Sequence, residues 1–439
     1  MKISWPREWP VRFAWIGISL AGALAIAAPW LTEWRVAMTT AATQNVLLVT
    51  TAADRGMGSL REAILAADRA DQYRRVLVMV PRIALESPLP PLVNPHGIML
   101  EAHRDGAILD AAGIAGAALD VAAPHTTVLG LHIVNAKAAI VIRASHVTVR
   151  SVIVEDSDTA VLVGEAAEET IVDRSTFRRN RLGVHAMGTG YTVISNSKFE
   201  DHRAAAVWAV AAENSASLPD LAIRDNRFTS DFSALVLVNR PSKVEQNVFE
   251  SVRDTAVFTS GTRAVIRSNQ IRSGRGFGIL LDQSTSSVVS RNEIAHNCSG
   301  GVMVRNARNT EIVSNELYQN GFGIVVLEGT RVSPNTVSDN LVADHAGDGL
   351  LLIASSPMVR RNRLLQNAHS GVRLATLLRE NAEPQEANPL LENNVMRGNG
   401  RDEPYRDAYV SASASDIVAP SDCSWRIAAA KLPTTEGMR

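Results

Sequence analysis

The chain has 439 residues, 46% of them hydrophobic and 5% aromatic, and its formal net charge is −1. This length exceeds one ordinary globular domain, so two domains or one extended repeat architecture is expected. The high apolar content excludes a disordered chain. The lack of a basic excess and the scarcity of aromatic residues argue against a nucleic-acid partner.

The first element is an uncharged apolar run at residues 13–31, preceded by Lys2, Arg7 and Arg12. Its length suits a transmembrane helix, and the basic flank places the N-terminus inside the cell. Tryptophans near both ends fit interfacial anchors: Trp5, Trp9, Trp30 and Trp34. We expect residues 1–40 to form a cytoplasmic tip and a membrane anchor, and a cleaved signal peptide is the alternative. Either places the rest of the chain outside the cytoplasm.

A short amphipathic helix is predicted within residues 58–68, GSLREAILAAD. Ser59 and Glu62 have the spacing of a capping box. The apolar residues that share one helical face are Leu60, Ala63, Ile64 and Ala67. Such a helix can plug an open apolar core, so we expect residues 41–110 to hold a cap and the first coils of a repeat.

A polar residue followed two positions later by a large apolar residue recurs along most of the remaining chain. The polar positions are Ser151, Ser175, Ser197, Asn226, Asn247, Asn269, Asn292, Asn315, Asn340, Asn362 and Asn394. The apolar partners are Ile153, Phe177, Phe199, Phe228, Phe249, Ile271, Ile294, Leu317, Val342, Leu364 and Met396. Spacings of 21 to 32 residues cluster near 22, the length of one β-helix coil. The pattern predicts an all-β solenoid of about ten coils, with regular coils over residues 111–400.

Two further apolar stripes keep the same period. One stands three residues before the polar position, at Val172, Ile194, Ile223, Val244, Ile266, Val289, Ile312, Val337 and Val359. The other follows a Gly or Ala, at Val184, Val207, Leu235, Val257, Ile279, Val302, Ile324, Leu350 and Val372. Each coil should therefore contain three short strands. We expect the Asn column to form a structural ladder of hydrogen bonds, and residues 401–439 to be a tail that covers the last coil.

The stretch VTTAADRGMGSLREAILAAD, residues 49–68, resembles the SLREAI-type cap of many secreted bacterial β-helix proteins. The N-x-[FIL] and G-[VI] coils resemble the right-handed parallel β-helix repeat of the pectin-lyase-like superfamily. The resemblance covers about residues 47–400 and implies the fold more strongly than the function. Members include polysaccharide lyases, uronate epimerases, glycoside hydrolases, adhesins and a periplasmic maturation factor of nitrous-oxide reductase.

In enzymes of this superfamily, the resemblance places catalysis on the exterior of the Gly-led strand and on the loops beside it. The first outward column there is His185, Trp208, Val236, Phe258, Leu280, Met303, Val325, Leu351 and Arg373. The next is Met187, Val210, Val238, Ser260, Asp282, Arg305, Leu327 and Ile353. An apolar stripe this long should not face water uncovered. We expect the C-terminal tail, a partner protein or a second copy of the chain to cover it.

A first candidate cluster of catalytic residues lies in loops before the Gly-led strand. It consists of Asp201, His202, Arg203, Asp231, Arg253, Asp254 and Arg275. Because adjacent coils stack about 4.8 Å apart, these side chains can converge. Carboxylates with an imidazole and arginines are a reasonable acid and base set for sugar chemistry. The alternative is a solvated, charged loop edge. Arg174, Arg178, Arg179 and Arg181 form a basic patch for an anionic glycan, or an ordinary solvated edge.

A second candidate cluster is Asp344, His345 and Asp348 in the sequence ADHAGDG. Two carboxylates and an imidazole can bind Ca²⁺ or act as acid and base. The alternative is that Asp348, between Gly347 and Gly349, belongs to a turn. No other cofactor is indicated by the sequence.

Signature motifs of the superfamily's enzymes are missing. The chain has no Asn-Thr-Asp, Gly-His-Gly or Arg-Ile-Lys sequence, and no Asp-Pro-His-Asp sequence. A polygalacturonase-type hydrolase is therefore not expected. The two cysteines, Cys298 and Cys423, exclude a zinc site and a disulfide framework. They can form one bridge if the chain is exported, or both stay free.

Three functions remain open. In the first, the protein binds an envelope or exported polysaccharide and can also modify it by lyase, epimerase or hydrolase chemistry. The protein would then sit in the bacterial cell envelope, anchored in the inner membrane, or be secreted if the N-terminal segment is cleaved. The second is a non-catalytic scaffold or assembly factor that docks a protein partner through the apolar stripe. The third is a periplasmic maturation factor for a metalloenzyme.

Overall fold

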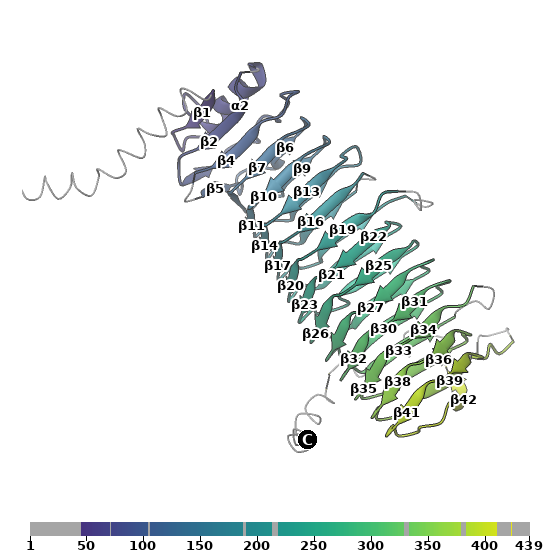
Figure 1. Ribbon diagram of the computed structural model, residues 1–439. Helices are drawn as coiled ribbons and strands as arrows, with labels where there is room; N and C mark the ends of the chain where they lie inside the picture. Colours follow the sequence, from purple (N-terminus) through teal and green to yellow (C-terminus); the bar gives the residue numbers. More distant parts are fainter. Residues whose placement is uncertain are drawn as a thin grey trace, which may run out of the picture.

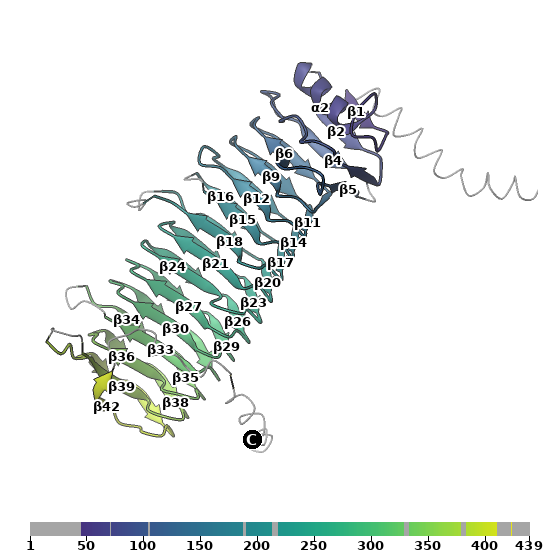
Figure 2. The ribbon, with the colours of Figure 1, turned by 180° about the vertical axis from the view of Figure 1, so that it is seen from behind.

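The computed structural model describes residues 45–70, 72–103, 106–187, 190–212, 218–328, 333–378, 383–410 and 423. Over these residues the chain forms a long stack of coils with three parallel sheets running along its axis (Figure 1). The view from behind shows the same elongated stack, with the only labelled helix at one end and β42 at the other (Figure 2). We name the three sheets A, B and C.

Sheet A contains fifteen strands in the described part of the chain. In stacking order they are β1 (Val46–Val49), β2 (Arg75–Val78), β4 (Met99–Ala102), β7 (Thr127–Leu129), β10 (Thr148–Arg150), β13 (Thr170–Asp173), β16 (Thr192–Ser195), β19 (Leu221–Arg224), β22 (Ser242–Glu245), β25 (Ala264–Arg267), β28 (Val288–Ser290), β31 (Glu311–Val313), β34 (Thr336–Ser338), β37 (Met358–Arg360) and β40 (Leu390–Glu392).

Sheet B contains fourteen strands among the same residues. They are β3 (Arg82–Ala84), β5 (Ala107–Asp110), β8 (Leu131–Val134), β11 (Ile153–Glu155), β14 (Thr176–Arg178), β17 (Lys198–Glu200), β20 (Arg227–Thr229), β23 (Val248–Glu250), β26 (Gln270–Arg272), β29 (Glu293–Ala295), β32 (Glu316–Tyr318), β35 (Leu341–Ala343), β38 (Arg363–Leu365) and β41 (Val395–Arg397).

Sheet C, which holds the Gly-led strands, has thirteen strands within the described ranges. They are β6 (Ala117–Val121), β9 (Ala138–Ile142), β12 (Thr159–Val163), β15 (Leu182–Ala186), β18 (Ala205–Val210), β21 (Ser233–Val238), β24 (Val257–Ser260), β27 (Phe277–Asp282), β30 (Gly300–Arg305), β33 (Phe322–Leu327), β36 (Leu350–Ile353), β39 (Val372–Leu377) and β42 (Tyr405–Val410).

The solenoid has about thirteen turns in its described part, so the prediction of about ten coils was too low. The early coils fill the position of the polar column with apolar residues. The strand register places Ala107, Leu131 and Val152 in that column, all fully buried. A search for a recurring Asn or Ser therefore misses these coils. Ser151 was predicted to belong to the polar column, but it is exposed at a corner with φ of 53°.

The predicted core stripes are confirmed. The residues three before the polar column lie in sheet A, and those after the Gly or Ala lie in sheet C; all eighteen are fully buried in the described structure. In sheet B, the rings of Phe177, Phe199, Phe228 and Phe249 stack at centroid distances of 5.0, 4.8 and 4.8 Å. The exception is Ile153, which faces solvent, while its neighbour Val154 is buried. Apolar burial in three columns is the main force holding the coils together.

The Asn column forms the predicted ladder. The Oδ1 atom of Asn292 accepts from the backbone N–H of Asn269 at 3.0 Å and from its Nδ2 at 2.9 Å. Asn292 in turn donates from Nδ2 to the Ile266 carbonyl at 2.9 Å and to Asn315 Oδ1 at 3.0 Å. The ladder thus satisfies buried amides in every coil from Ser197 to Asn394. These asparagines are structural.

The predicted cap helix is α2 (Leu60–Arg69), which contacts β1 and β2 at the N-terminal end of the stack. Its buried face is the predicted one: Leu60, Ala63, Ile64 and Ala67. Ser59 Oγ accepts from the Glu62 N–H at 3.2 Å, while the Ser59 N–H donates to the Gly56 carbonyl. One half of the predicted capping box is therefore formed.

No helix in the described part of the chain is long and apolar enough to span a membrane. The predicted anchor at residues 13–31 lies outside the described residues, so it stays a prediction. At the other end, β42 adds a last strand to sheet C through backbone pairing with β39. Cys298 and Cys423 form a disulfide, with their Cα atoms 5.3 Å apart, which settles the pairing that the sequence left open.

Candidate functional site

The corner between sheets B and C decides where most of the predicted site residues lie. One residue at this corner has a positive φ in successive coils: Asp156, Arg179, Asp201, Ser230, Ser251, Ser273, His296, Gln319, Asp344 and Gln366. Polar residues tolerate this left-handed conformation better than β-branched ones. Asp201 and Asp344, one from each candidate cluster, are therefore exposed corner residues.

The residue after the corner points into the stack and forms a second internal ladder. Backbone bonds between coils place Asn180, His202, Asp231, Asn297, Asn320, His345, Asn367 and Asn399 in this column. Asn297 donates from Nδ2 to Asn320 Oδ1 at 3.0 Å, repeating the geometry of the first ladder. This column was not predicted from the sequence, although each of its five asparagines stands five residues after a polar residue of the first column.

His202 and Asp231 form a buried pair in this second ladder. His202 Nδ1 lies 2.7 Å from Asp231 Oδ1, which also accepts from the His202 backbone N–H at 3.0 Å. Both side chains are completely buried. The His202 ring packs 5.9 Å from the Phe199 ring, measured between centroids. The pair therefore belongs to the core and does not meet Asp201 and Arg203 at the surface.

His345 also replaces an Asn in the ladder. Its Nδ1 accepts from the Asn320 backbone N–H at 3.0 Å, and the backbone N–H of His345 donates to Asn367 Oδ1 at 3.2 Å. Burial lowers the pKa of His345 to about 3, because the charged imidazolium would lose its water. This imidazole is neutral at physiological pH and is not placed for surface chemistry.

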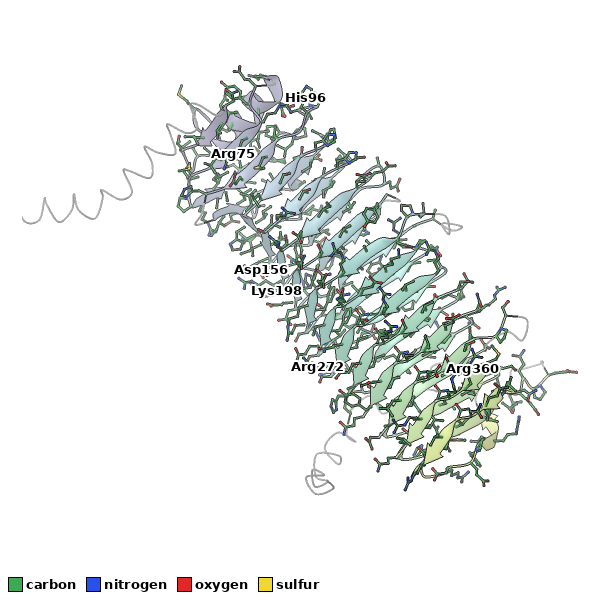
Figure 3. The ribbon with its side chains drawn as sticks, in the orientation of Figure 1. Arg75, His96, Asp156, Lys198, Arg272 and Arg360 are labelled. Atoms are coloured by element: carbon green, nitrogen blue, oxygen red, sulfur yellow. A yellow bond between two sulfur atoms is a disulfide. The ribbon has the colours of Figure 1, made fainter. Side chains whose placement is uncertain are left out.

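The second residue after the corner faces outward in each coil, and in several successive coils it is an arginine. In five consecutive coils this position holds Arg181, Arg203, Phe232, Arg253 and Arg275, which we call the arginine row. All but Arg181 and Phe232 came from the first candidate cluster. Phe232 is 49% exposed. Figure 3 labels Asp156, at the corner next to this row, together with Lys198 of sheet B.

A surface cavity of about 470 Å³ lies at the N-terminal part of the arginine row. Its lining residues are Asp156, Arg179, Asp201, Arg203 and Arg253. Three of the predicted site residues, Asp201, Arg203 and Arg253, therefore come together at the surface. Asp254 is exposed beside Arg253 but is held by the Ser233 hydroxyl, which donates to Asp254 Oδ2 at 3.0 Å.

Ion pairing divides the arginines into two kinds. Arg181 forms a bidentate pair with Asp158 at 2.6 and 3.0 Å, which lowers the pKa of Asp158. Arg253 donates to the Ser230 carbonyl at 2.6 Å and lies 3.4 Å from Asp201 Oδ1. Arg203 and Arg275 form no ion pair or side-chain hydrogen bond with any part of the chain that the structure describes. The charge of Arg203 helps to lower the pKa of Asp156 and of Asp158, but the hydrogen-bond donors of both guanidinium groups can still bind an anion.

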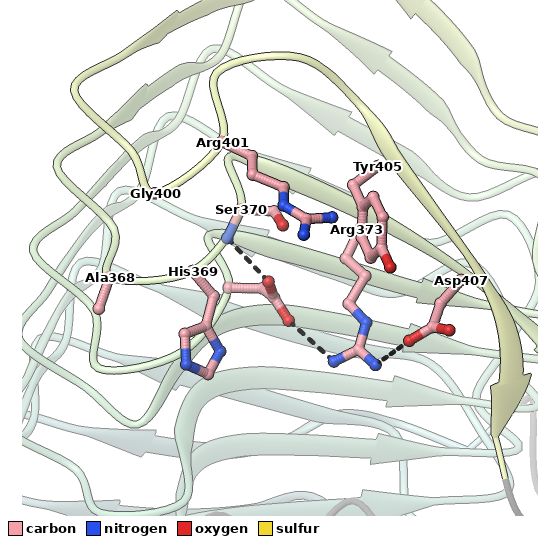
Figure 4. A pocket seen from close by; sticks show the side chains of 9 residues that line it. Ala368, His369, Ser370, Arg373, Gly400, Arg401, Tyr405 and Asp407 are labelled. Carbon is pink, nitrogen blue, oxygen red and sulfur yellow. Dashed lines mark hydrogen bonds and ion pairs between the residues drawn. The ribbon is translucent and has the colours of Figure 1, made fainter.

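A second cavity, of about 310 Å³, lies at the C-terminal end of the stack between the last coils (Figure 4). Its lining residues are Asp348, Ala368, His369, Ser370, Arg373, Gly400, Arg401, Tyr405 and Asp407. Of the second candidate cluster, only Asp348 lines this cavity. Asp344 is at the corner and His345 is in the internal ladder, so the three side chains do not converge.

The described residues do not form a metal-binding site. Within the described ranges, no group of three or more His, Cys, Asp or Glu side chains gathers as metal ligands would. The Ca²⁺ suggested for Asp344, His345 and Asp348 would need these three groups on one point. Their separate surroundings do not fit that ion.

The outward face of sheet C carries the two predicted columns in register, as the strand pairs from His185 and Trp208 to Leu351 and Arg373 show. Its N-terminal half is open, with Trp208 36% exposed. Burial lowers the pKa of His185 there. In the C-terminal half the outward apolar residues are at most 5% exposed: Met303, Val325, Leu327, Leu351, Ile353, Ala375 and Leu377. Covering of that half by residues 401–439 stays a prediction.

Comparison with known proteins agrees with this architecture. Residues 121–240 and 210–364 match the family described as "Right handed beta helix region". The two matches together span more than half of the chain, which therefore belongs to the right-handed β-helix family. This match confirms the right-handed parallel β-helix that the resemblance implied. No curated protein sequence matches the chain.

Among similar solved structures is tailspike protein 3 of bacteriophage CBA120, with a TM-score of 0.53 and 13% identity, covering 81% of this chain and 58% of that one. A variant of the periplasmic alginate epimerase AlgG has a TM-score of 0.44 and 13% identity, covering 82% and 88%. The catalytic unit of an alpha-1,3-glucanase from Streptomyces thermodiastaticus has a TM-score of 0.45 and 13% identity, covering 81% and 68%. At these identities the likeness concerns the fold.

Proposed function

We propose that the protein binds an extended acidic polysaccharide along the arginine row. The observation that carries this proposal is the repeated, outward position of four arginines in five successive coils, two of which form no ion pair or side-chain hydrogen bond within the described residues. Successive coils lie about 4.8 Å apart, so the row offers cations at a regular interval. A polymer with a carboxylate on each sugar residue presents anions in the same repeated manner.

The side chains of the row suit such a ligand in chemistry as well as spacing. A guanidinium binds a carboxylate through two parallel hydrogen bonds, which makes arginine better suited than lysine to this recognition. Phe232, in the middle of the row, offers an exposed ring against which the apolar face of a sugar can pack. Asp156 and Asp201 in the adjoining cavity can accept hydrogen bonds from sugar hydroxyls.

The proposal places the protein in the bacterial envelope. The Cys298–Cys423 disulfide supports an oxidising compartment, since such bonds are rare in the cytoplasm. An anchor at residues 13–31 would hold the solenoid at the outer face of the inner membrane, and cleavage of that segment would release it. Membrane anchorage is part of the proposal.

Binding is tested with the purified full-length protein against polymannuronate, polygalacturonate and neutral dextran. We expect both acidic polymers to bind and dextran not to bind, with affinity falling as salt is added. The double variant Arg203→Gln/Arg275→Gln should weaken binding about tenfold or more, because each lost charged hydrogen bond contributes about 1.5 kcal/mol. Arg361→Gln is the matched control, since Arg361 is an exposed arginine paired with Asp339 at another corner.

Equal binding of dextran and the acidic polymers, or an unchanged affinity of the double variant, would contradict the proposal. The same samples show whether the protein is also an enzyme, through the ultraviolet absorbance of unsaturated uronate, new reducing ends and NMR of the recovered polymer. Product that disappears in Asp201→Ala and persists in Asp344→Ala would assign the chemistry to the cavity beside the arginine row.

A docking role is the second candidate function. The open half of the sheet C face presents Trp208, Val236, Phe258 and Leu280 in one outward column. Apolar side chains in a row of this kind favour contact with a protein partner or with a second copy of the chain. If the protein binds none of the polysaccharides, this docking role becomes the better-supported function. The variant Trp208→Ser would then test it, because it should abolish binding of the partner or formation of the dimer.

A further inference from the structure

The cavity at the C-terminal end of the stack contains a buried carboxylate with unused hydrogen-bonding capacity. Asp348 is completely buried, and its Oδ1 accepts from the Ser370 N–H at 2.9 Å. Its Oδ2 has no hydrogen-bond partner in the described structure. A buried polar atom without a partner is costly, and natural proteins leave few of them. Because Asp348 lines the cavity, a ligand in the cavity can supply the missing donor.

The charges around this cavity balance, which limits the kind of ligand that it can take. Arg373 Nη1 lies 3.6 Å from Asp348 Oδ2, and its Nη2 lies 2.5 Å from Asp407 Oδ2. The guanidinium of Arg401 lies 3.7 Å above the centre of the Tyr405 ring. The charges of the two carboxylates and the two guanidinium groups cancel. A metal ion is disfavoured because the Arg373 guanidinium is paired with Asp348 Oδ2, and the cavity offers no net charge to attract an anion.

The size and walls of the cavity suit a small hydroxylated molecule. Its volume of about 310 Å³ is at the lower end of the range for ligand pockets, enough for about one sugar residue. Figure 4 shows Arg373, Arg401, Tyr405 and Asp407 gathered around the opening. Carboxylate, guanidinium and phenol groups can accept from and donate to several hydroxyls at once. Such a ligand gives the Oδ2 atom of Asp348 the donor that it lacks.

We propose that the cavity formed by Asp348, Arg373, Tyr405 and Asp407 is a binding site for one neutral sugar residue. The site is separate from the arginine row: Ala368 and Gly400 of the cavity occupy the same outward position as the row, four and five coils beyond Arg275. It therefore takes either a free neutral sugar or a neutral residue of a longer glycan. The proposal does not depend on acidic polymer binding.

The test uses the full-length protein and saturation-transfer NMR with glucose, mannose, galactose, N-acetylglucosamine and glucuronate as probes. We expect at least one neutral sugar to bind in the cavity, and glucuronate to bind no more tightly. Asp348→Asn keeps the acceptor for the Ser370 N–H and replaces the unpartnered acceptor with a donor, so it should weaken binding at least tenfold. Tyr405→Ala, at the half-exposed rim, should also weaken binding without removing a buried group.

Arg363→Gln serves as the control, because Arg363 is exposed on sheet B in a neighbouring coil. Thermal melting confirms that each variant is folded, and Tyr405→Ala decides the outcome if Asp348→Asn unfolds. No binding of any neutral sugar would overturn the proposal, as would binding in both cavity variants that is as tight as in the parent protein. Arg203→Gln/Arg275→Gln should leave sugar binding unchanged, and Asp348→Asn should leave acidic polymer binding unchanged, so the two proposals can fail separately.

Discussion

His345 shows what a single residue type does at a ladder position. An Asn at this position offers an acceptor and a donor that stay uncharged at every pH. His345 offers Nδ1 as an acceptor to the Asn320 N–H, and it can do so only while that nitrogen is unprotonated. Its Nε2 has no hydrogen-bond partner in the described structure. The imidazole therefore makes the fold sensitive to acid at one point of the core.

The stability of the protein should fall in acid because of His345. Its pKa is about 3 when folded and 6.5 in the reference state of an exposed imidazole. Between these values the unfolded chain binds a proton that the folded chain does not, so stability rises with pH across this window and is lost as pH falls from 6.5. At pH 4.5 the penalty is about 2–3 kcal/mol. His345→Asn should remove it, measured as a higher thermal midpoint at pH 4.5 than that of the parent protein.

His369→Asn is the control for this prediction, since the His369 imidazole is exposed one coil further on. It should not change the acid sensitivity. If His345→Asn and the parent lose stability in parallel between pH 7 and pH 4.5, then the acid sensitivity has another source and the buried imidazole is not responsible.

At the residue scale, the sequence showed which residue types were unusual but not which way they point. His202 and His345 each stand next to an acidic residue, and this pairing favoured acid and base chemistry. Both imidazoles lie in the second internal ladder, where their neighbours are the residues of adjacent coils. The two-residue alternation at a tight corner sends Asp201 out, His202 in and Arg203 out. Without the register of the coils, this alternation cannot be assigned.

At the scale of elements, the two Asn ladders join the coils where the strands turn. Each ladder residue bonds to the coil before it and the coil after it, as Asn292 does with Asn269 and Asn315. Hydrogen bonds of this kind contribute about 1 kcal/mol each, but leaving their buried partners unpaired costs more. A ladder residue therefore affects two interfaces between coils at once.

Asn292→Ala should destabilise the stack by about 3 kcal/mol. It leaves the Asn269 N–H, the Asn269 Nδ2 and the Ile266 carbonyl without the bonds that Asn292 makes. Asn292→Ser should cost less, because Ser175 and Ser197 accept backbone N–H groups in the same column of earlier coils. The midpoint of urea unfolding, followed by circular dichroism, measures both.

Gln270→Ala, on the exposed face of β26, is the control and should leave the midpoint unchanged. Equal loss in the Ala and Ser variants would show that the cavity left by the side chain matters more than the missing acceptor. No loss in either variant would show that the ladder is not needed for stability.

At the scale of the whole molecule, the disulfide ties two distant parts of the chain together. Cys298 lies in the turn before β30, and Cys423 is 125 residues later in the sequence. Between them the chain adds the coils that include the C-terminal cavity. A covalent link across so many residues restricts the unfolded chain far more than the folded one.

Reduction of the disulfide should lower stability by about 5 kcal/mol in the chain-entropy account, because the closed loop is longer than 100 residues. Thermal melting with and without dithiothreitol measures this change. The variant Cys298→Ser/Cys423→Ser should melt like the reduced parent protein and should not respond to dithiothreitol. A parent protein whose melting is the same in both states would show that the link has no effect on stability.

The sequence by itself determined the solenoid, the three strands in each coil, the Asn ladder and the cap helix. It did so because the core columns repeat with one period, and burial requires the same residue type at each recurrence. It undercounted the coils where Ala107, Leu131 and Val152 replace the polar residue of the column.

Only the tertiary structure decided which polar residues share a surface. The arginine row and the C-terminal cavity each bring together residues from different coils, about 20 positions or more apart in the sequence, and their convergence depends on the register between coils. Successive residues at the corner point alternately to the solvent and to the core. A shift of the assigned register by one position would therefore exchange a ladder residue for a surface residue. The register is a property of stacked coils, and the order of residues along the chain does not state it.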